Sequence, residues 1–154
     1  MTWGAVPSAN IPPPLPNEYG ATFVSDHQGN TIWVLTVVYD NTFTPFMSRL
    51  LQSDDKGKHW YIRNPNLPFS GNDAIIRFRN HSVGLYKNNG ALYRTTDGGT
   101  NWNAVAWTGN YFSFCFDNVP GVAGSWVSTG GDDEFPGNAM YGYGSSITFD
   151  DGDS

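Results

Sequence analysis

The stretch that decides the fold of this chain is Thr95-Thr-Asp-Gly-Gly-Thr-Asn-Trp102. It carries a hydroxyl, an acid and a glycine at alternate positions, and a tryptophan follows three residues after that glycine. The pattern recurs at Ser53, Asp55, Gly57 and Trp60, and again, without a tryptophan, at Thr148, Asp150 and Gly152. This spacing is typical of a tight β-hairpin whose return strand begins with an aromatic anchor. The acids recur 42 residues apart (Asp55 and Asp97) and 53 residues apart (Asp97 and Asp150), which indicates a repeat architecture.

The composition indicates an all-β protein. Aromatic residues make up 16% of the 154 residues and charged residues only 14%, while 18 residues are glycine and 10 are proline. Glycine and proline supply turns, and aromatic side chains fill the space between sheets. No window of helical length has apolar residues at three- and four-residue spacing, so we expect essentially no helix.

Charge and hydropathy exclude several kinds of partner. A net charge of −6 repels phosphate groups, so no nucleic-acid partner is expected. The longest apolar run, residues 32–38, is too short for membrane insertion. The first residues lack the basic and apolar segments of a signal peptide.

The single cysteine, Cys115, can form no intrachain disulfide, and its alternation with phenylalanines predicts a buried, unreactive thiol.

Segments rich in β-branched and aromatic residues recur in the same order around each repeat. The predicted strands are 21–26, 31–38, 48–53 and 60–63; 74–80, 81–86, 91–95 and 102–107; and 111–118, 125–129 and 145–149. Four short antiparallel strands repeated radially form the blades of a β-propeller. The blade units are expected to span residues 17–64, 72–107 and 111–154. Thr2–Pro7 resembles residues 101–106, so residues 1–7 are expected to be the last strand of a preceding blade.

The three copies resemble the Asp-box, or bacterial neuraminidase repeat, whose pattern is Ser/Thr-x-Asp-x-Gly-x-Thr-x-Trp or a version one residue shorter. Families that share this box include sialidases, xyloglucan-cleaving glycoside hydrolases, sortilin-type receptors, the photosystem II assembly propeller and large secreted bacterial proteins with sorting domains. Residues 92–99 and 119–128 are most similar to the last group. The resemblance implies an all-β, partial β-propeller of about three four-stranded blades with Asp-box hairpins, and a secreted, extracellular or cell-surface location.

The box residues are expected to be structural rather than catalytic. Their acids can accept hydrogen bonds from turn amides, their glycines permit a positive φ, and their hydroxyls add a local bond. Their tryptophans are expected to pack between blades. These residues are Ser53, Asp55, Gly57, Trp60, Thr95, Asp97, Gly99, Trp102, Thr148, Asp150 and Gly152.

Two sets of residues are candidates for ligand binding. Arg77 and Arg79 alternate with apolar residues, so both are predicted to project from one face of an innermost strand that lines the central channel. A guanidinium there could bind a carboxylate, or the two arginines could pair with acids of the protein.

The second set lies in the loop 130–144, which strand direction places opposite the boxes, together with residues 39–47, 64–73 and 87–91. Acids beside rings suit a sugar, although a solvated acidic loop is the alternative. The set comprises Asp132, Asp133, Glu134, Tyr141 and Tyr143.

No metal or cofactor is expected. The three histidines have no ligand spacing, and residues 150–153 lack the alternating acids of a calcium loop. The sialidase Arg-Ile-Pro signature is also absent, and no catalytic residue is identified. The leading hypothesis is a non-catalytic structural or ligand-binding segment of a secreted propeller, with a carbohydrate or a protein as ligand. The alternative is part of a sialidase-like or other glycoside hydrolase.

The third unit lacks a fourth strand in this sequence. Missing blades of a longer parent chain are expected to supply it, or the Thr2–Pro7 strand of a second copy does so by exchange. An open strand edge favours aggregation. The isolated chain is therefore expected to be marginally stable and to self-associate.

Overall fold

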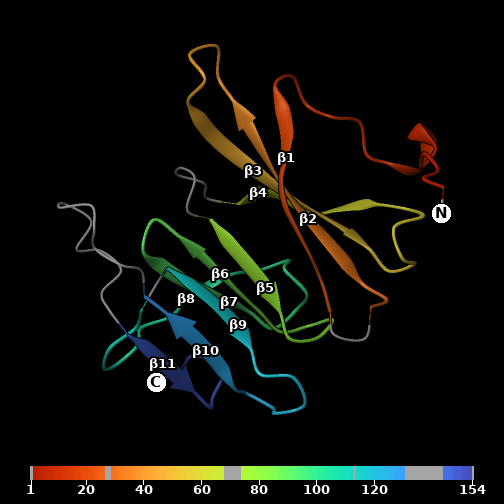
Figure 1. Ribbon diagram of the computed structural model, residues 1–154. Helices are drawn as coiled ribbons and strands as arrows, with labels where there is room; N and C mark the ends of the chain where they lie inside the picture. The colour runs from red at the N-terminus through yellow and green to blue at the C-terminus, as the bar shows by residue number, and fades with distance from the viewer. Residues whose placement is uncertain (1, 27–28, 68–73, 113, 131–143, 154) are drawn as a thin grey trace.

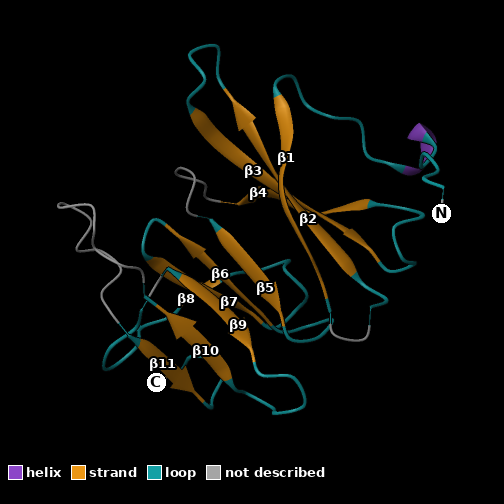
Figure 2. Ribbon diagram, viewed as in Figure 1, coloured by secondary structure: helices purple, strands orange, loops and turns teal. Residues whose placement is uncertain are grey.

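The computed structural model describes residues 2–26, 29–67, 74–112, 114–130 and 144–153 (Figure 1). Strands and turns make up almost all of this part of the chain, as predicted, and the single helical element is the 3₁₀ turn Ser8–Asn10 (Figure 2). Within the same residues, no helix has the length and hydrophobicity needed to cross a membrane.

The strands form three antiparallel sheets, each in simple meander order. The first sheet contains β1 (Glu18–Ser25), β2 (Ile32–Tyr39), β3 (Pro45–Ser53) and β4 (Tyr61–Leu67). The second contains β5 (Ile75–Phe78), β6 (Gly84–Asn88), β7 (Ala91–Thr95) and β8 (Asn103–Ala104). The third contains β9 (Cys115–Asn118), β10 (Trp126–Thr129) and β11 (Ser145–Thr148). This arrangement of four, four and three strands confirms the predicted all-β class.

The predicted strands differ from the observed ones mainly at their ends. The inner strand of the third sheet begins at Cys115 rather than at residue 111, and β8 contains two residues rather than the six predicted. The first two boxes connect β3 with β4 and β7 with β8, and the third follows β11. All three boxes therefore lie at the same end of the sheets.

The core lies between the sheets rather than within one of them. The first cluster joins Trp33, Leu35 and Leu50 of the first sheet with Ile76 and Phe78 of the second. Trp33 and Phe78 stack with their ring centroids 3.7 Å apart and nearly parallel. The second cluster joins the second and third sheets and consists of Leu85, Leu92, Phe116 and Trp126. The alternation of side chains along each strand thus gives the middle sheet two buried faces.

Residues 2–7 form no strand in the structure, and the side chain of Trp3 is fully exposed. The following turn packs on the first box: Asn10 accepts a hydrogen bond from the Trp60 amide (2.8 Å), and its Nδ2 donates to the Lys58 carbonyl (3.1 Å). The N-terminus consequently lies beside the first sheet, while the C-terminal box lies beside the third (Figure 1).

The prediction that Cys115 is a buried thiol is wrong, because the structure places it on an exposed face of β9. Phe116 points toward the second sheet and is buried, so Cys115 and Asp117 point to the opposite side. No described sheet covers that side. The alternation of buried and exposed residues along β9 was correctly predicted. Which residues are the buried ones depends on the side from which a neighbouring sheet covers the strand.

Candidate functional site

Each Asp-box is a turn held together by its own side chains. In the second box, Thr95 Oγ1 donates to Asp97 Oδ1 (2.8 Å) and accepts from the Gly99 amide (2.9 Å). Asp97 Oδ1 also accepts from the Asn101 amide (2.9 Å). Both the hydroxyl and the carboxylate of the box are therefore engaged in hydrogen bonds within the turn.

The first box repeats these contacts, and the third repeats the bond between hydroxyl and carboxylate. Ser53 Oγ donates to Asp55 Oδ1 (2.9 Å) and accepts from the Gly57 amide (2.8 Å). In the third box, Thr148 Oγ1 donates to Asp150 Oδ1 (2.5 Å), which also accepts from the Asp153 amide (3.0 Å). Such contacts stabilise a turn, and they leave these acids poorly placed to act as catalytic acids or bases.

The pKa values of two box acids are displaced downward. Hydrogen bonds from the side chain and then the backbone of His59 hold the pKa of Asp55 well below its usual range. Burial raises the pKa of Asp97, but the hydrogen bonds that it accepts from Asn101 and Thr95 outweigh burial and lower it overall. Hydrogen bonds to the charged form of a carboxyl have this effect. Both acids are therefore carboxylates at neutral pH.

The tip of the second box also touches the first sheet. Trp33 Nε1 donates to the Gly98 carbonyl (3.1 Å), and the Arg63 guanidinium donates to the carbonyls of Asp97 and Gly98. A Cβ added to Gly99, whose φ is +97°, would lie 2.5 Å from Leu50 of the first sheet. The box is thus part of the contact between neighbouring sheets, and its glycine allows the close approach.

Arg79 pairs with the third box. Its guanidinium donates from Nε to Asp151 Oδ1 (3.0 Å) and from Nη2 to Asp151 Oδ2 (2.9 Å). Trp126 Nε1 also donates to Asp151 Oδ1 (2.9 Å). This bidentate pair links the second sheet to the third, so Arg79 is not available to a ligand in this arrangement.

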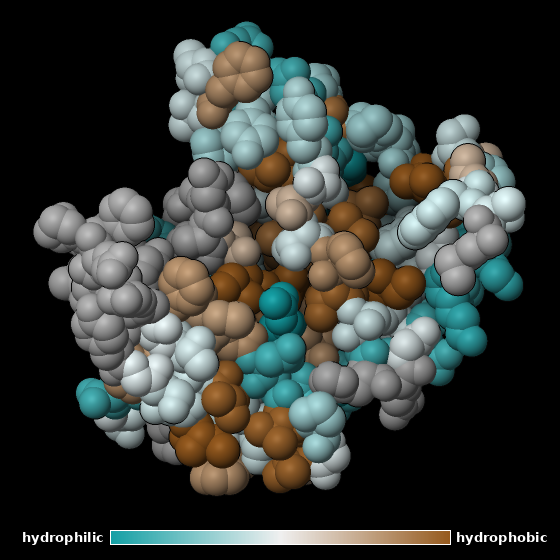
Figure 3. Space-filling model, in the orientation of Figure 1, coloured by the Kyte–Doolittle hydropathy of each residue, from teal (hydrophilic) through white to brown (hydrophobic). Residues whose placement is uncertain are grey.

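Arg77 lies on β5, whereas Arg79 follows its last residue, and Arg77 makes weaker contacts than Arg79. Its Nε is 3.7 Å from Asp117 Oδ2, and its Nη1 donates to the Ile76 carbonyl (2.8 Å). Arg77 and Asp117 border an open hollow of about 560 Å³ among the inner strands, together with Asp26 and residues of β1. On the face of the molecule that Figure 3 shows, hydrophobic and hydrophilic residues lie side by side near the middle.

The predicted acidic and aromatic set lies outside the described residues. Asp132, Asp133, Glu134, Tyr141 and Tyr143 all fall in the segment 131–143. Their role as ligand-binding residues stays a prediction.

Exposed rings gather at the β2–β3 turn and at the neighbouring ends of β1 and β3, opposite the boxes, and they were not among the predicted site residues. Phe43 is 80% exposed, Phe46 58% and Tyr19, on the adjacent strand β1, 55%. Tyr19 contacts Tyr39 edge to face, with ring centroids 5.8 Å apart. The sequence feature that could have indicated this surface is the presence of three aromatic residues within residues 39–46.

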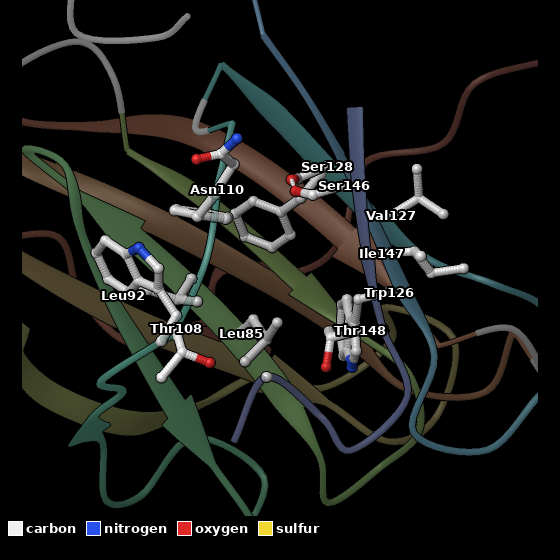
Figure 4. Close-up of a pocket in the computed structure, with 14 residues that line it drawn as sticks. Leu85, Leu92, Thr108, Asn110, Trp126, Val127, Ser128, Ser146, Ile147 and Thr148 are labelled. Atoms are coloured by element: carbon white, nitrogen blue, oxygen red, sulfur yellow. Dashed lines mark hydrogen bonds between the residues drawn. The ribbon is translucent and has the colours of Figure 1, made fainter. Parts of the chain in front are cut away.

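A cavity of about 70 Å³ lies between the second and third sheets, next to the third box. Figure 4 shows Leu85 and Leu92 on one side of it and Ser128 and Ser146 on another, whereas Ile147 points away. The two serine hydroxyls are 2.6 Å apart. Within the described residues, no group of His, Cys, Asp or Glu side chains is arranged to hold a metal ion.

Comparisons with known proteins place this geometry in a fold. No family model and no curated protein matches the sequence. Among solved structures, the chain is similar to YCF48 bound to D1 peptide, with 15% identity and a TM-score of 0.54 over 90% of this chain. It is also similar to a GH74 enzyme from Niastella koreensis, with 21% identity and a TM-score of 0.53 over 88% of this chain.

At these identities the similarity shows the fold alone. The chain spans 38% of the YCF48 chain and 22% of the GH74 enzyme. Its three sheets thus correspond to part of a β-propeller of the Asp-box type, and each sheet corresponds to one blade.

Proposed function

We propose that this chain is a non-catalytic, ligand-binding segment of an exported Asp-box β-propeller, and that it binds a carbohydrate or a protein chain. The observation that carries the proposal is the exposed aromatic turn between β2 and β3, where Phe43 of the turn and Phe46 at the start of β3 project into solvent. The box acids and Arg79, by contrast, are occupied by contacts that hold the blades together.

The aromatic turn is held in a fixed shape. Asp40 Oδ1 accepts hydrogen bonds from the amides of Thr42 (2.8 Å) and Thr44 (2.9 Å) and from the Thr42 hydroxyl (2.7 Å). Phe43 has a φ of +59°, a conformation that a bulky residue rarely adopts without such support. A turn shaped before the ligand arrives loses little conformational entropy on binding.

The similar structures fit either class of ligand. One is a protein with a bound peptide and the other is a GH74 enzyme. A phenylalanine ring can pack on the apolar face of a sugar or on an apolar side chain of a peptide. An exported location rests on the Asp-box resemblance, and the sequence that flanks this chain in its genome would test it directly.

Binding can be tested by screening the 154-residue chain against a polysaccharide array and a peptide array, followed by titration calorimetry with the best ligand. Phe43→Ala is expected to weaken binding at least tenfold. Phe149→Ala, which removes a 69%-exposed ring beside the third box, serves as the matched control and should leave binding unchanged. Equal losses in both variants, or no binding to either array, would contradict the proposal.

The alternative function is a glycoside hydrolase. It is favoured by the hollow among the inner strands, where Arg77 lies 3.7 Å from Asp117 and where Asp26 is a further lining acid. Glycoside hydrolysis requires a pair of carboxyl groups. Turnover of a fluorogenic sialoside or glucan that disappears in Arg77→Ala would favour the enzyme. Unchanged turnover in this variant would exclude the hollow at Arg77 as the catalytic site.

A further inference from the structure

Residues 11–16, Ile11-Pro-Pro-Pro-Leu-Pro16, form a proline segment that connects the 3₁₀ turn Ser8–Asn10 to β1 and belongs to no helix or strand (Figure 1). A proline ring holds φ at about −65°, and a residue that precedes a proline is kept in extended backbone conformations. Four of the six residues precede a proline, and the peptide bonds of the segment are trans. The sequence therefore favours a polyproline II helix, which has about three residues per turn.

The exposure of the side chains follows this period of three. Pro12 and Leu15, three positions apart, are partly buried. The other four side chains are exposed and form two further pairs at the same spacing, Ile11 with Pro14 and Pro13 with Pro16. One edge of the helix thus lies against the protein, and the other two edges face solvent.

Hydrogen bonds hold the proline segment at both ends. Before its start, the Asn10 carbonyl accepts a hydrogen bond from the Trp60 amide (2.8 Å). Near its end, the Leu15 amide donates to Glu18 Oε2 (2.7 Å), and the Glu18 amide donates to the Leu15 carbonyl (3.2 Å). The segment is therefore attached to the first box on one side and to β1 on the other.

A buried ion pair holds the middle of the proline segment. Arg49 Nε donates to Glu18 Oε1 (2.7 Å), and the two side chains are only 7% and 3% exposed. Thr36 Oγ1 donates to the same carboxylate oxygen (2.5 Å). Arg49 Nη2 also donates to the Pro13 carbonyl (3.1 Å). Because buried charges are costly unless they are paired and hydrogen-bonded, this pair has little freedom to move, and it fixes the segment on the first sheet.

The proline segment has no hydrogen-bond donor to offer a ligand. Its four prolines lack a backbone N–H, and its side chains are all apolar. The Ile11 amide donates to the Ser8 carbonyl (3.2 Å), and the Leu15 amide donates to Glu18. A ligand must therefore pack on proline rings and donate hydrogen bonds to carbonyl groups. Tyrosine and tryptophan side chains do both, since each has an apolar ring and one O–H or N–H donor.

We propose that the proline segment is a docking site for a partner protein that has a groove lined by aromatic side chains. Such grooves bind polyproline II segments that present prolines three positions apart, as Pro13 and Pro16 are. The segment is held in this conformation before the partner arrives, so little conformational entropy is lost on docking. This surface is distinct from the turn that carries Phe43.

Docking can be tested with a panel of isolated SH3, WW and EVH1 domains as probes, immobilised for surface plasmon resonance, with the 154-residue chain in solution. At least one domain is expected to bind with a Kd in the micromolar range. Pro13→Ala and Pro16→Ala are each expected to raise this Kd at least fivefold, because each removes one ring of an exposed pair. Pro120→Ala, which removes an exposed proline ring between β9 and β10, is the matched control and should leave the Kd unchanged. No binding to any probe, or equal effects in Pro13→Ala and Pro120→Ala, would overturn the proposal.

A second set of measurements separates docking from folding and from the ligand-binding turn. Pro13→Ala and Pro16→Ala remove exposed rings, so the melting temperature is expected to fall by only a few degrees. Phe43→Ala is expected to leave the Kd for the bound probe unchanged. A loss of probe binding in Phe43→Ala that equals the loss in Pro13→Ala would assign the binding to the aromatic turn and would overturn the proposal. Failure of the polysaccharide and peptide arrays would leave these outcomes unaffected.

Discussion

The tryptophan of the second box packs against the core cluster that joins the first two blades. Its ring packs against Phe78 and Tyr86, and its nitrogen closes the turn through Gly99. Trp102→Ala is expected to lower the free energy of unfolding by about 3–5 kcal/mol, because it removes the packing and leaves a cavity. Urea denaturation gives the measurement. Phe43→Ala, at an 80%-exposed position, should change stability by less than about 0.5 kcal/mol. A similar, small effect in both variants would mean that the indole does not hold the blades together.

The box acids should make stability depend on acid pH. Because the folded-state pKa of Asp97 is lowered, its contribution to stability is fully present above the unfolded value of about 3.9 and is lost as the pH falls through the folded value. The urea midpoint is therefore expected to fall between pH 6 and pH 3. Asp97→Asn should be less stable at pH 6 and less sensitive to this change in pH. Parallel curves for the two proteins would contradict this assignment.

At the scale of single residues, the box could be read from the sequence because its contacts are local. Thr95, Asp97 and Gly99 contact one another within a few positions of the chain. Cys115 and Arg79 could not be placed in this way, since their surroundings come from residues far along the chain. Arg79 lies 72 positions from its partner Asp151, and no local pattern indicates such a pair.

At the scale of elements, neighbouring blades are joined by guanidinium groups as well as by apolar side chains. Arg63 reaches the second box, Arg79 reaches Asp151, and Arg94 Nη1 is 2.6 Å from Asp153 Oδ2 in the third box. Each arginine belongs to the preceding blade. The boxes therefore orient each blade on the one before it.

A double-mutant cycle would measure one of these links. Arg79 and Asp151 form a bidentate pair whose side chains are both 21% exposed, so a coupling free energy of about 1 kcal/mol is expected. Arg77 and Asp117 provide the matched control, because they are 3.7 Å apart and Asp117 is 61% exposed. Exposed pairs of this kind contribute close to zero. Equal coupling in the two cycles would mean that the Arg79 pair does not link the blades.

Strand order and hairpin position were also predictable from the sequence, and strand ends were less so. Periodicity and turn residues indicated that each complete box joins the third strand of a blade to the fourth, as the structure has it. The length of β8 depends on its pairing with β7, which includes Asn103 and Ala104 and is followed by one more hydrogen bond, from the Val105 amide to the Leu92 carbonyl (2.9 Å). The exposed rings at Phe43 and Phe46 were within a segment expected opposite the boxes, but their exposure could not be inferred from residue type.

At the scale of the whole molecule, the three blades have unequal support. The second blade is covered on both faces, because the first cluster packs on one side and the second cluster on the other. Within the described residues, the third blade has one covered face and β11 has no outer strand. In a repeat protein, the stability of a unit depends on its own contacts and on its nearest neighbours.

This inequality predicts the order in which the blades open. Native-state hydrogen exchange, at concentrations where the chain is monomeric, is expected to show the fastest exchange in β9–β11 and slower exchange in β5–β7. The reason is that opening the third blade exposes only the second cluster, whereas opening the second blade exposes both clusters. Equal exchange rates across the three blades would show that the molecule opens as one cooperative unit, and the dependence of each blade on its neighbours would then lose its support.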